Sequence, residues 1–128
     1  GKYYDETSND CLFCPAGKFT ATGGIGIEEC EVCPEGFYSS EPGSSTCFTC
    51  DPGTYTNKNQ TKCLLCPAGE FSGVAASVCT LCEKGKYAEG KGNEACTFCD
   101  DKDTLLGSIT VKNGTTSVSG CICPAGEY

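Results

Sequence analysis

The chain of 128 residues contains no histidine, tryptophan or methionine, and it has nine Lys and Arg side chains against seventeen Asp and Glu. The lack of histidine removes a common general base and metal ligand, and no G-x-S-x-G motif or phosphate-binding loop occurs. A formal net charge of −8 argues against a nucleic-acid or anionic-membrane partner. We therefore expect no enzyme, no catalytic residues, no cofactor and no nucleic-acid partner.

Long apolar stretches are also missing. No run approaches the roughly 18 residues of a membrane span, so we expect none in this segment. Apolar residues reach 38 % only when the fourteen cysteines are counted. The sequence therefore predicts no large hydrophobic core.

The fourteen cysteines form six C-x-x-C pairs and one C-x-C pair. The leading cysteines recur about every 17 residues, at positions 11, 30, 47, 63, 79, 96 and 121. Such self-similarity predicts a tandem array in which each small module contacts its neighbours. The expected modules are a partial repeat 1–13, repeats 14–32, 33–49, 50–65, 66–81 and 82–98, a divergent repeat with a hairpin 99–122, and the start of a further repeat 123–128.

Modules of about 17 residues lie far below the roughly 40 residues at which a chain folds without covalent or metal staples. Four-cysteine zinc sites are one alternative, but histidine is absent and fourteen ligands do not divide into fours. A redox role for C-x-x-C would need a strand before the motif and a helix after it, whereas most pairs here run into Pro-x-Gly turns. We expect disulfides, no metal, and an extracellular location, whether secreted, cell-surface or matrix.

The spacing also predicts the disulfide pairing. The second cysteine of one pair and the first of the next enclose loops of nearly constant length, and closing such a loop removes about 3 kcal/mol of unfolded-chain entropy. An interlocked pairing, first to third and second to fourth, remains open. The expected bridges are Cys14–Cys30, Cys33–Cys47, Cys50–Cys63, Cys66–Cys79, Cys82–Cys96 and Cys99–Cys121.

Turn chemistry follows each pair. Proline presets φ and glycine accepts φ > 0, so Pro-x-Gly-x-aromatic predicts a turn followed by a short strand. We expect the aromatic ring to pack over the adjacent disulfide. In the divergent repeat, Asn113-Gly114 lies between two β-favouring runs and predicts a two-residue hairpin turn. The apolar residues between paired cysteines should pack at module junctions: Leu12, Phe13, Val32, Phe48, Leu64, Leu65, Leu81, Phe98 and Ile122.

The motif C-x-x-C-P-x-G-x-[FY], with the next C-x-x-C 8 to 11 positions after the aromatic in the regular units, resembles the ephrin-receptor-like cysteine-rich repeat. It is also similar to the first submodule of tumour necrosis factor receptor domains. The resemblance implies a small disulfide-rich fold: an elongated tandem array of short β-hairpin modules stapled by a disulfide ladder, with little helix. Such repeats occur in receptor ectodomains and in surface and matrix proteins.

Two N-x-T sequons, at Asn59 and Asn113, predict N-linked glycans on exposed loops. Gly1-Lys2-Tyr3 has the form of Gly126-Glu127-Tyr128, as if each end lay inside a repeat. We expect Cys11 and Cys123 to bridge to flanking repeats of the same chain or head-to-tail to another copy. The predicted function is an extracellular structural or scaffolding rod within a longer array or filament. The alternative is a receptor ectodomain module that binds a protein ligand.

Overall fold

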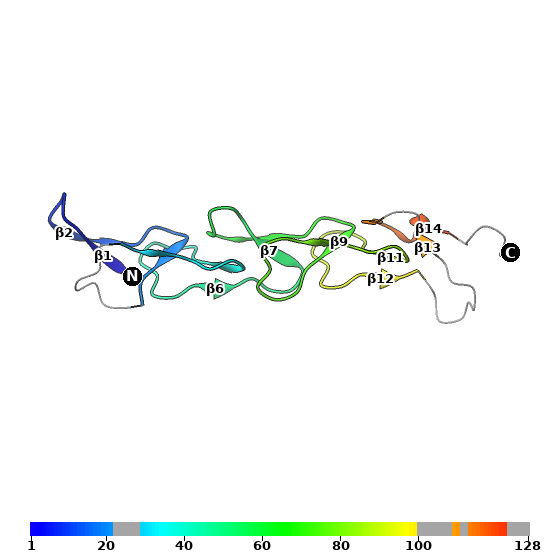
Figure 1. Ribbon diagram of the computed structural model, residues 1–128, viewed down its shortest axis with the longest axis horizontal. Coiled ribbons are helices and arrows are strands. Elements are labelled where there is room, and N and C mark those ends of the chain that lie inside the picture. Colours follow the sequence, from blue (N-terminus) through cyan, green and yellow to red (C-terminus); the bar gives the residue numbers. More distant parts are fainter. Residues whose placement is uncertain (22–28, 100–108, 111–112, 123–128) are drawn as a thin grey trace. The chain divides into compact units, whose positions relative to one another are not determined.

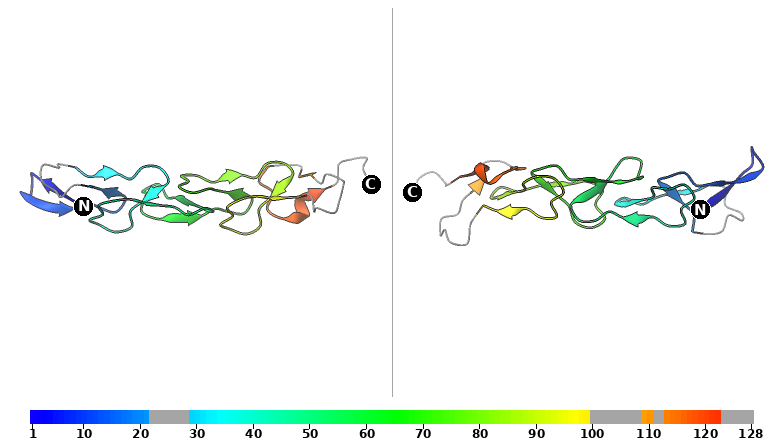
Figure 2. Two further views of the ribbon diagram at one scale, coloured as in Figure 1. Left: turned by 90° about the horizontal axis from the view of Figure 1, so that it is seen from below. Right: turned by 180° about the vertical axis from the view of Figure 1, so that it is seen from behind.

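The computed structural model describes residues 1–21, 29–99, 109–110 and 113–122. In these ranges the secondary structure consists of seven two-stranded sheets and one short 3₁₀ helix, η1 (Val118–Gly120) (Figure 1). The views in Figure 2 show the strands in pairs, without a larger sheet. No helix within the described part is long and apolar enough to cross a membrane. The expected class, a disulfide-rich array of hairpins without a large core, is confirmed.

The pairs are β1 (Lys2–Asp5) with β2 (Asp10–Phe13), β3 (Lys18–Phe19) with β4 (Glu31–Val32), β5 (Phe37–Tyr38) with β6 (Phe48–Thr49), β7 (Thr54–Thr56) with β8 (Cys63–Leu65), β9 (Glu70–Phe71) with β10 (Thr80–Leu81), β11 (Lys86–Tyr87) with β12 (Thr97–Phe98), and β13 (Ile109–Thr110) with β14 (Cys121–Ile122).

A tight turn precedes each regular hairpin, as the sequence predicts. The Lys18 N–H donates to the Pro15 carbonyl at 3.1 Å, and Gly17 between them has φ +85°. A type II turn requires positive φ at this position, where a Cβ would be strained. The same turn forms where Glu83 replaces the proline, with Lys86 donating to Glu83. Glycine is therefore the essential residue of the turn, and proline is dispensable.

The chain divides into two compact units. The first comprises Gly1–Asp51, Tyr55–Leu64 and Val74–Ser77, and the second comprises Pro52–Thr54, Leu65–Gly73 and Val78–Tyr128. The residues of the β7–β8 hairpin are divided between them.

Among the described cysteines, six disulfides close the loops, and they are the pairs that the loop lengths predict, not the interlocked alternative. Their sequence separations run from 13 to 16 residues in the regular modules and reach 22 in the divergent one. The bridges are Cys14–Cys30, Cys33–Cys47, Cys50–Cys63, Cys66–Cys79, Cys82–Cys96 and Cys99–Cys121.

The core of each regular module is small. Its centre is the second cysteine of each pair, at 2 % exposure or less: Cys14, Cys33, Cys50, Cys66 and Cys82. We expected the aromatic ring to complete the core, but the rings are only half-buried. The residue after the ring takes the buried position instead, because a neighbouring loop packs against its backbone. These residues are Thr20, Ser39, Thr56, Ser72 and Ala88.

Backbone hydrogen bonds join neighbouring modules at recurring junctions. Each junction combines a turn glycine, the next buried cysteine and a left-handed residue of a later loop. Cys66 donates its N–H to the Gly53 carbonyl at 2.9 Å and accepts the Gly92 N–H at 2.8 Å. A Cβ on Gly53 would lie 2.7 Å from the Gly92 carbonyl carbon, so only glycine fits there. Corresponding junctions are Gly36, Cys50 and Ala75; Gly69, Cys82 and Gly114; and Gly1, Cys14 and Gly43.

The junction of Gly17, Cys33 and Gln60 departs from this pattern. Gln60 is left-handed, with φ +54°, but its N–H donates to Asn57 within its own turn. The side-chain amide of Gln60 replaces that donor and reaches the Cys33 carbonyl. A side chain thus satisfies a carbonyl that a backbone N–H satisfies at the other junctions.

The predicted two-residue hairpin turn at Asn113-Gly114 is wrong. The strands that pair in this repeat are β13 and β14. They place Thr110 opposite Cys121, so the connection between them is the segment 111–120 and not two residues. Gly114 has φ +72°, but its N–H donates to the Cys82 carbonyl at 2.7 Å. The left-handed glycine therefore serves a module junction and not a hairpin turn.

Candidate interaction surface

Apolar side chains between paired cysteines are exposed at each regular module and at Ile122. We expected these residues to pack at junctions. Three of them do lie over a glycine two modules further along the chain: Phe13 over Gly43, Leu65 over Gly92 and Leu81 over Gly114. Even these are 53 to 62 % exposed, so the junctions do not bury them. The exposed set includes Leu12, Phe13, Val32, Phe48, Leu65, Leu81, Phe98 and Ile122.

Two of the hairpins carry the same lysine–phenylalanine pair. Register places Lys2 opposite Phe13 and Lys86 opposite Phe98. The ammonium groups lie 4.6 Å and 4.7 Å from the two ring centroids, within the range of a cation–π interaction. These pairs were not predicted, although the sequence contains a pattern that indicates them. In both hairpins a lysine directly follows the turn-glycine position, and a phenylalanine directly precedes the second cysteine of the next pair.

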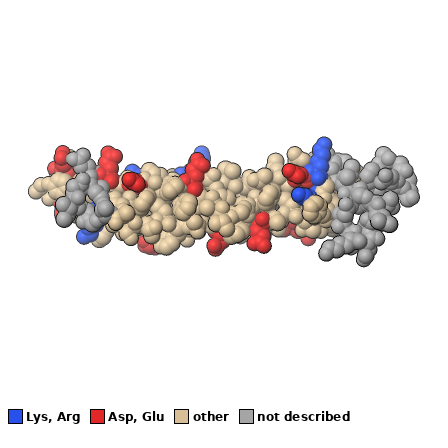
Figure 3. Space-filling model, turned by 60° about the horizontal axis from the view of Figure 1, so that its bottom comes forward, with Lys and Arg blue, Asp and Glu red and all other residues tan. Residues whose placement is uncertain are grey.

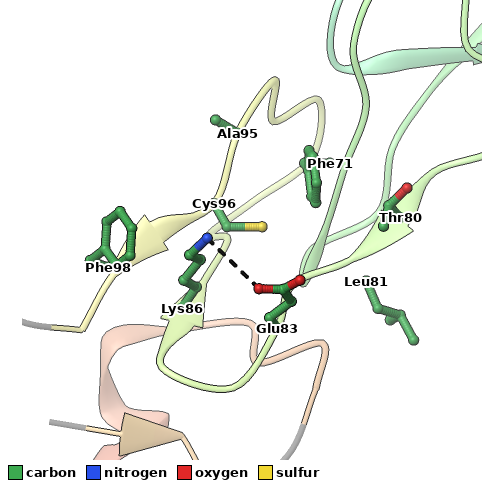
Figure 4. Close-up of a pocket in the computed structure, with 8 residues that line it drawn as sticks. All are labelled: Phe71, Thr80, Leu81, Glu83, Lys86, Ala95, Cys96 and Phe98. Carbon is green, nitrogen blue, oxygen red and sulfur yellow. Dashed lines mark ion pairs between the residues drawn. The ribbon is translucent and has the colours of Figure 1, made fainter.

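Within the second unit, one such pair borders a pocket of about 340 Å³. Figure 4 shows the Lys86 side chain between Phe98 and Glu83. The Lys86–Glu83 ion pair is 4.0 Å long, and the Glu83 side chain is 81 % exposed, so the pair is weak. Apolar walls surround this ion pair. The lining residues are Phe71, Thr80, Leu81, Glu83, Lys86, Ala95, Cys96 and Phe98.

Charge is spread over the surface. The face in Figure 3 shows Asp and Glu side chains singly or in small groups among uncharged residues. Asp5 is the last residue of β1, and its carboxylate accepts hydrogen bonds from Thr7 and Ser8 of the turn that leads to β2. The Thr7 side-chain bond, followed by that of Ser8, lowers the pKa of Asp5. In the described ranges no three His, Cys, Asp or Glu side chains converge as metal ligands.

The predicted glycosylation residues and the cysteine expected to bridge to a neighbour, within the described part of the chain, are all exposed. Asn59 and Asn113 are both exposed. Cys11 in β2 is exposed and is the free cysteine of the described part of the chain. Cys123 lies outside the described residues.

The hairpins, neighbour disulfides and glycine–cysteine junctions together define a tandem array of small disulfide-bonded modules. The family model described as tyrosine-protein kinase ephrin type A/B receptor-like matches four times, over residues 1–45, 23–60, 36–77 and 69–121. The chain therefore belongs to the family of ephrin-receptor-like cysteine-rich repeats, as its motif predicts.

The chain is also similar to the mouse and rat forms of a protein named Sushi, von Willebrand factor type A, EGF and pentraxin domain-containing protein 1. It is 33 % identical to the mouse protein and 32 % identical to the rat protein, each over 113 residues. These matches cover 84 % of this chain and 3 % of each relative. With its six disulfides, the chain is an extracellular cysteine-rich repeat module of a non-catalytic kind.

Proposed function

We propose that this chain is a stiff structural spacer within a longer extracellular array and is not an enzyme. The observation that carries the proposal is the repeated junction. Each one ties three consecutive modules by two hydrogen bonds at a buried cysteine, with no room for a side chain at the glycine, as at Gly53, Cys66 and Gly92. In a repeat array each module contacts only its neighbours, so stiffness at every junction adds along the chain.

Small-angle scattering of the oxidised protein tests this function. Three residue steps span at most about 10 Å and a disulfide adds roughly 5.5 Å, so six modules extend over no more than about 90 Å. A thin rod of that length has a radius of gyration of about 26 Å, whereas a compact chain of this size has about 14 Å. A value near 14 Å would contradict the spacer function. A value that stays constant as salt is varied supports stiffness.

We propose further that Cys11 links the array to its neighbour, either a flanking repeat or a second copy placed head-to-tail. Its counterpart in the next module, Cys30, is bridged to Cys14, three residues before the turn glycine. Cys11 lies in β2, which corresponds to the strand β4 that directly follows Cys30, and Cys11 is exposed. Head-to-tail contacts that do not close produce filaments. We propose the same role for Cys123.

Native material on reducing and non-reducing gels distinguishes the two neighbours. High-mass species that disappear on reduction indicate a bridge between copies, and an unchanged mass with no reactive thiol indicates a bridge within a longer chain. Maleimide labelling of Cys11 in the unreduced native protein would contradict both.

The alternative function, a module that binds a protein ligand, is favoured by the pocket beside Lys86. The partner we propose presents an apolar side chain next to a carboxylate, because the pocket has apolar walls and Lys86 is only weakly held by the exposed Glu83. Lys86→Glu should then abolish binding of a full-length partner identified by crosslinking, while Lys84→Glu, at an exposed neighbouring position, should not. Equal effects of the two substitutions would refute a role for the pocket.

A further inference from the structure

We propose that the two sequons are modified at different stages of folding: Asn59 accepts an N-glycan in the folded protein, and Asn113 accepts one only before its module folds. Transfer requires that both the asparagine amide and the threonine hydroxyl of an N-x-T sequon be reachable. Both asparagines are exposed, but the two threonines differ. Thr115 has 5 % exposure, whereas Thr61 is half-buried.

The sequon at Asn59 lies at the tip of a local turn. Asn57 closes this turn from within, since its Oδ1 accepts the Thr61 N–H at 2.9 Å and its Nδ2 donates to the Thr61 hydroxyl at 2.9 Å. These bonds join residues four positions apart. Gln60, inside the sequon, is tied to the preceding module by its side-chain amide, which donates to the Cys33 carbonyl, and by its own carbonyl, which accepts the Ser39 N–H at 3.0 Å. Freeing the Thr61 hydroxyl breaks only the two bonds to Asn57 and leaves these junction bonds of Gln60 in place. Local openings of this kind need far less free energy than global unfolding. Thr61 can therefore become accessible while the rest of the protein stays folded.

The sequon at Asn113 is tied to the preceding module. The Gly114 N–H donates to the Cys82 carbonyl at 2.7 Å, and the Thr115 carbonyl accepts the Ala88 N–H at 3.0 Å. Thr115 also forms a parallel bridge with Tyr87. Exposing its hydroxyl would break a module junction inside the loop that Cys99–Cys121 closes. The opening is therefore sub-global and rare.

The reaction itself uses an oligosaccharide linked to a lipid pyrophosphate as donor. The amide nitrogen of asparagine attacks the first sugar carbon, a nitrogen–carbon bond forms, and the carbon–oxygen bond to the pyrophosphate breaks. The lipid pyrophosphate leaves with the bonding electron pair, and one amide proton passes to a base of the transferase. No oxidation or reduction takes place, so disulfides affect the reaction only through access to the sequon.

The test uses the purified oligosaccharyltransferase, its lipid-linked donor and the unglycosylated 128-residue chain in two states. One sample is oxidised and folded, and the other is reduced and alkylated. Peptide mapping measures the rate of glycan transfer to each asparagine. In the reduced sample we expect transfer to both. In the folded sample we expect transfer to Asn59 to persist and transfer to Asn113 to fall at least tenfold.

Matched variants distinguish the accessibility of each sequon in the folded chain from its intrinsic ability to accept a glycan. Thr61→Ala and Thr115→Ala should each abolish transfer at their own asparagine in the reduced chain. A Cys99→Ser, Cys121→Ser chain should regain transfer at Asn113 when otherwise oxidised, with the Asn59 rate as the internal check that the other modules remain folded. Equal Asn113 rates in folded and reduced wild type would overturn the proposal, and so would loss of Asn59 transfer on folding or absence of transfer in both states.

Discussion

Replacing Gly53 by alanine should damage one junction by a predictable amount. Gly53 has φ +82°, where an L-residue costs about 1–2 kcal/mol. The new Cβ would also lie 2.7 Å from the Gly92 carbonyl carbon, and forcing extra volume into a packed site costs about 1–3 kcal/mol. The two contributions together give about 2–5 kcal/mol of local destabilisation.

Two other glycines of the second unit separate these contributions. Gly90 has φ +66° but open space around a Cβ, so Gly90→Ala should cost only the backbone strain of about 1–2 kcal/mol. Gly73 has neither positive φ nor a close neighbour, so Gly73→Ala should be neutral or stabilise by about 0.4–1 kcal/mol through the unfolded state.

Amide hydrogen exchange is the suitable assay, because a repeat array need not unfold in two states. The Cys66 and Gly92 amides donate the two bonds of this junction. Their opening free energies should fall by the full amount in Gly53→Ala, while the Cys33 amide of the first unit should change little. If Gly53→Ala lowers protection at Cys66 no more than Gly90→Ala does, the close approach of Gly53 and Gly92 contributes nothing to the opening free energy. The claim that these junctions stabilise the array would then be refuted.

Three further predictions follow from single residues. Gln60→Ala should destabilise the first unit by about 1–3 kcal/mol, because the buried Cys33 carbonyl loses its donor; amide hydrogen exchange in the first unit measures this, with the exposed Lys58→Ala as control. Ala75→Gly should stabilise by about 0.5–1 kcal/mol, since Ala75 has φ +56°, and Ala76→Gly should show no such gain. The stabilisation of the β1–β2 turn by Asp5 should be present above the ordinary pKa of 3.8 and be lost as pH falls through the lowered value. NMR of the Thr7 and Ser8 amides follows that loss, and Asp5→Asn should remove the titration.

Much of the fold could be predicted because cysteine and glycine carry strong local constraints. Loop lengths between cysteines limit which bridges form, and the glycine after each pair marks the turn whatever residue precedes it, as Glu83 shows. The residue after each aromatic could also have been predicted to be buried, from its size. In the regular modules it is small, being Thr, Ser or Ala, because a neighbouring loop packs on it.

Long-range junctions are what sequence reasoning could not reach. Gly114 next to an asparagine suits a hairpin turn by local preference, but the N–H of Gly114 bonds to Cys82. Gln60 and Ala75 take left-handed conformations that neither residue prefers, since tertiary contacts hold them there. The pocket beside Lys86 also depends on how β9, β10, β11 and β12 pack together. Only the Lys86–Phe98 pair within it follows from hairpin register.

The central claim is that covalent bridges to the neighbouring cysteine pair close each module and so set up the junctions. Non-reducing peptide mapping of the native protein, with thiols blocked before digestion, tests it directly. We predict the linked peptides Cys14–Cys30, Cys33–Cys47, Cys50–Cys63, Cys66–Cys79, Cys82–Cys96 and Cys99–Cys121. Interlocked bridges such as Cys30–Cys47 with Cys33–Cys50, or stoichiometric zinc with free thiols throughout, would contradict it.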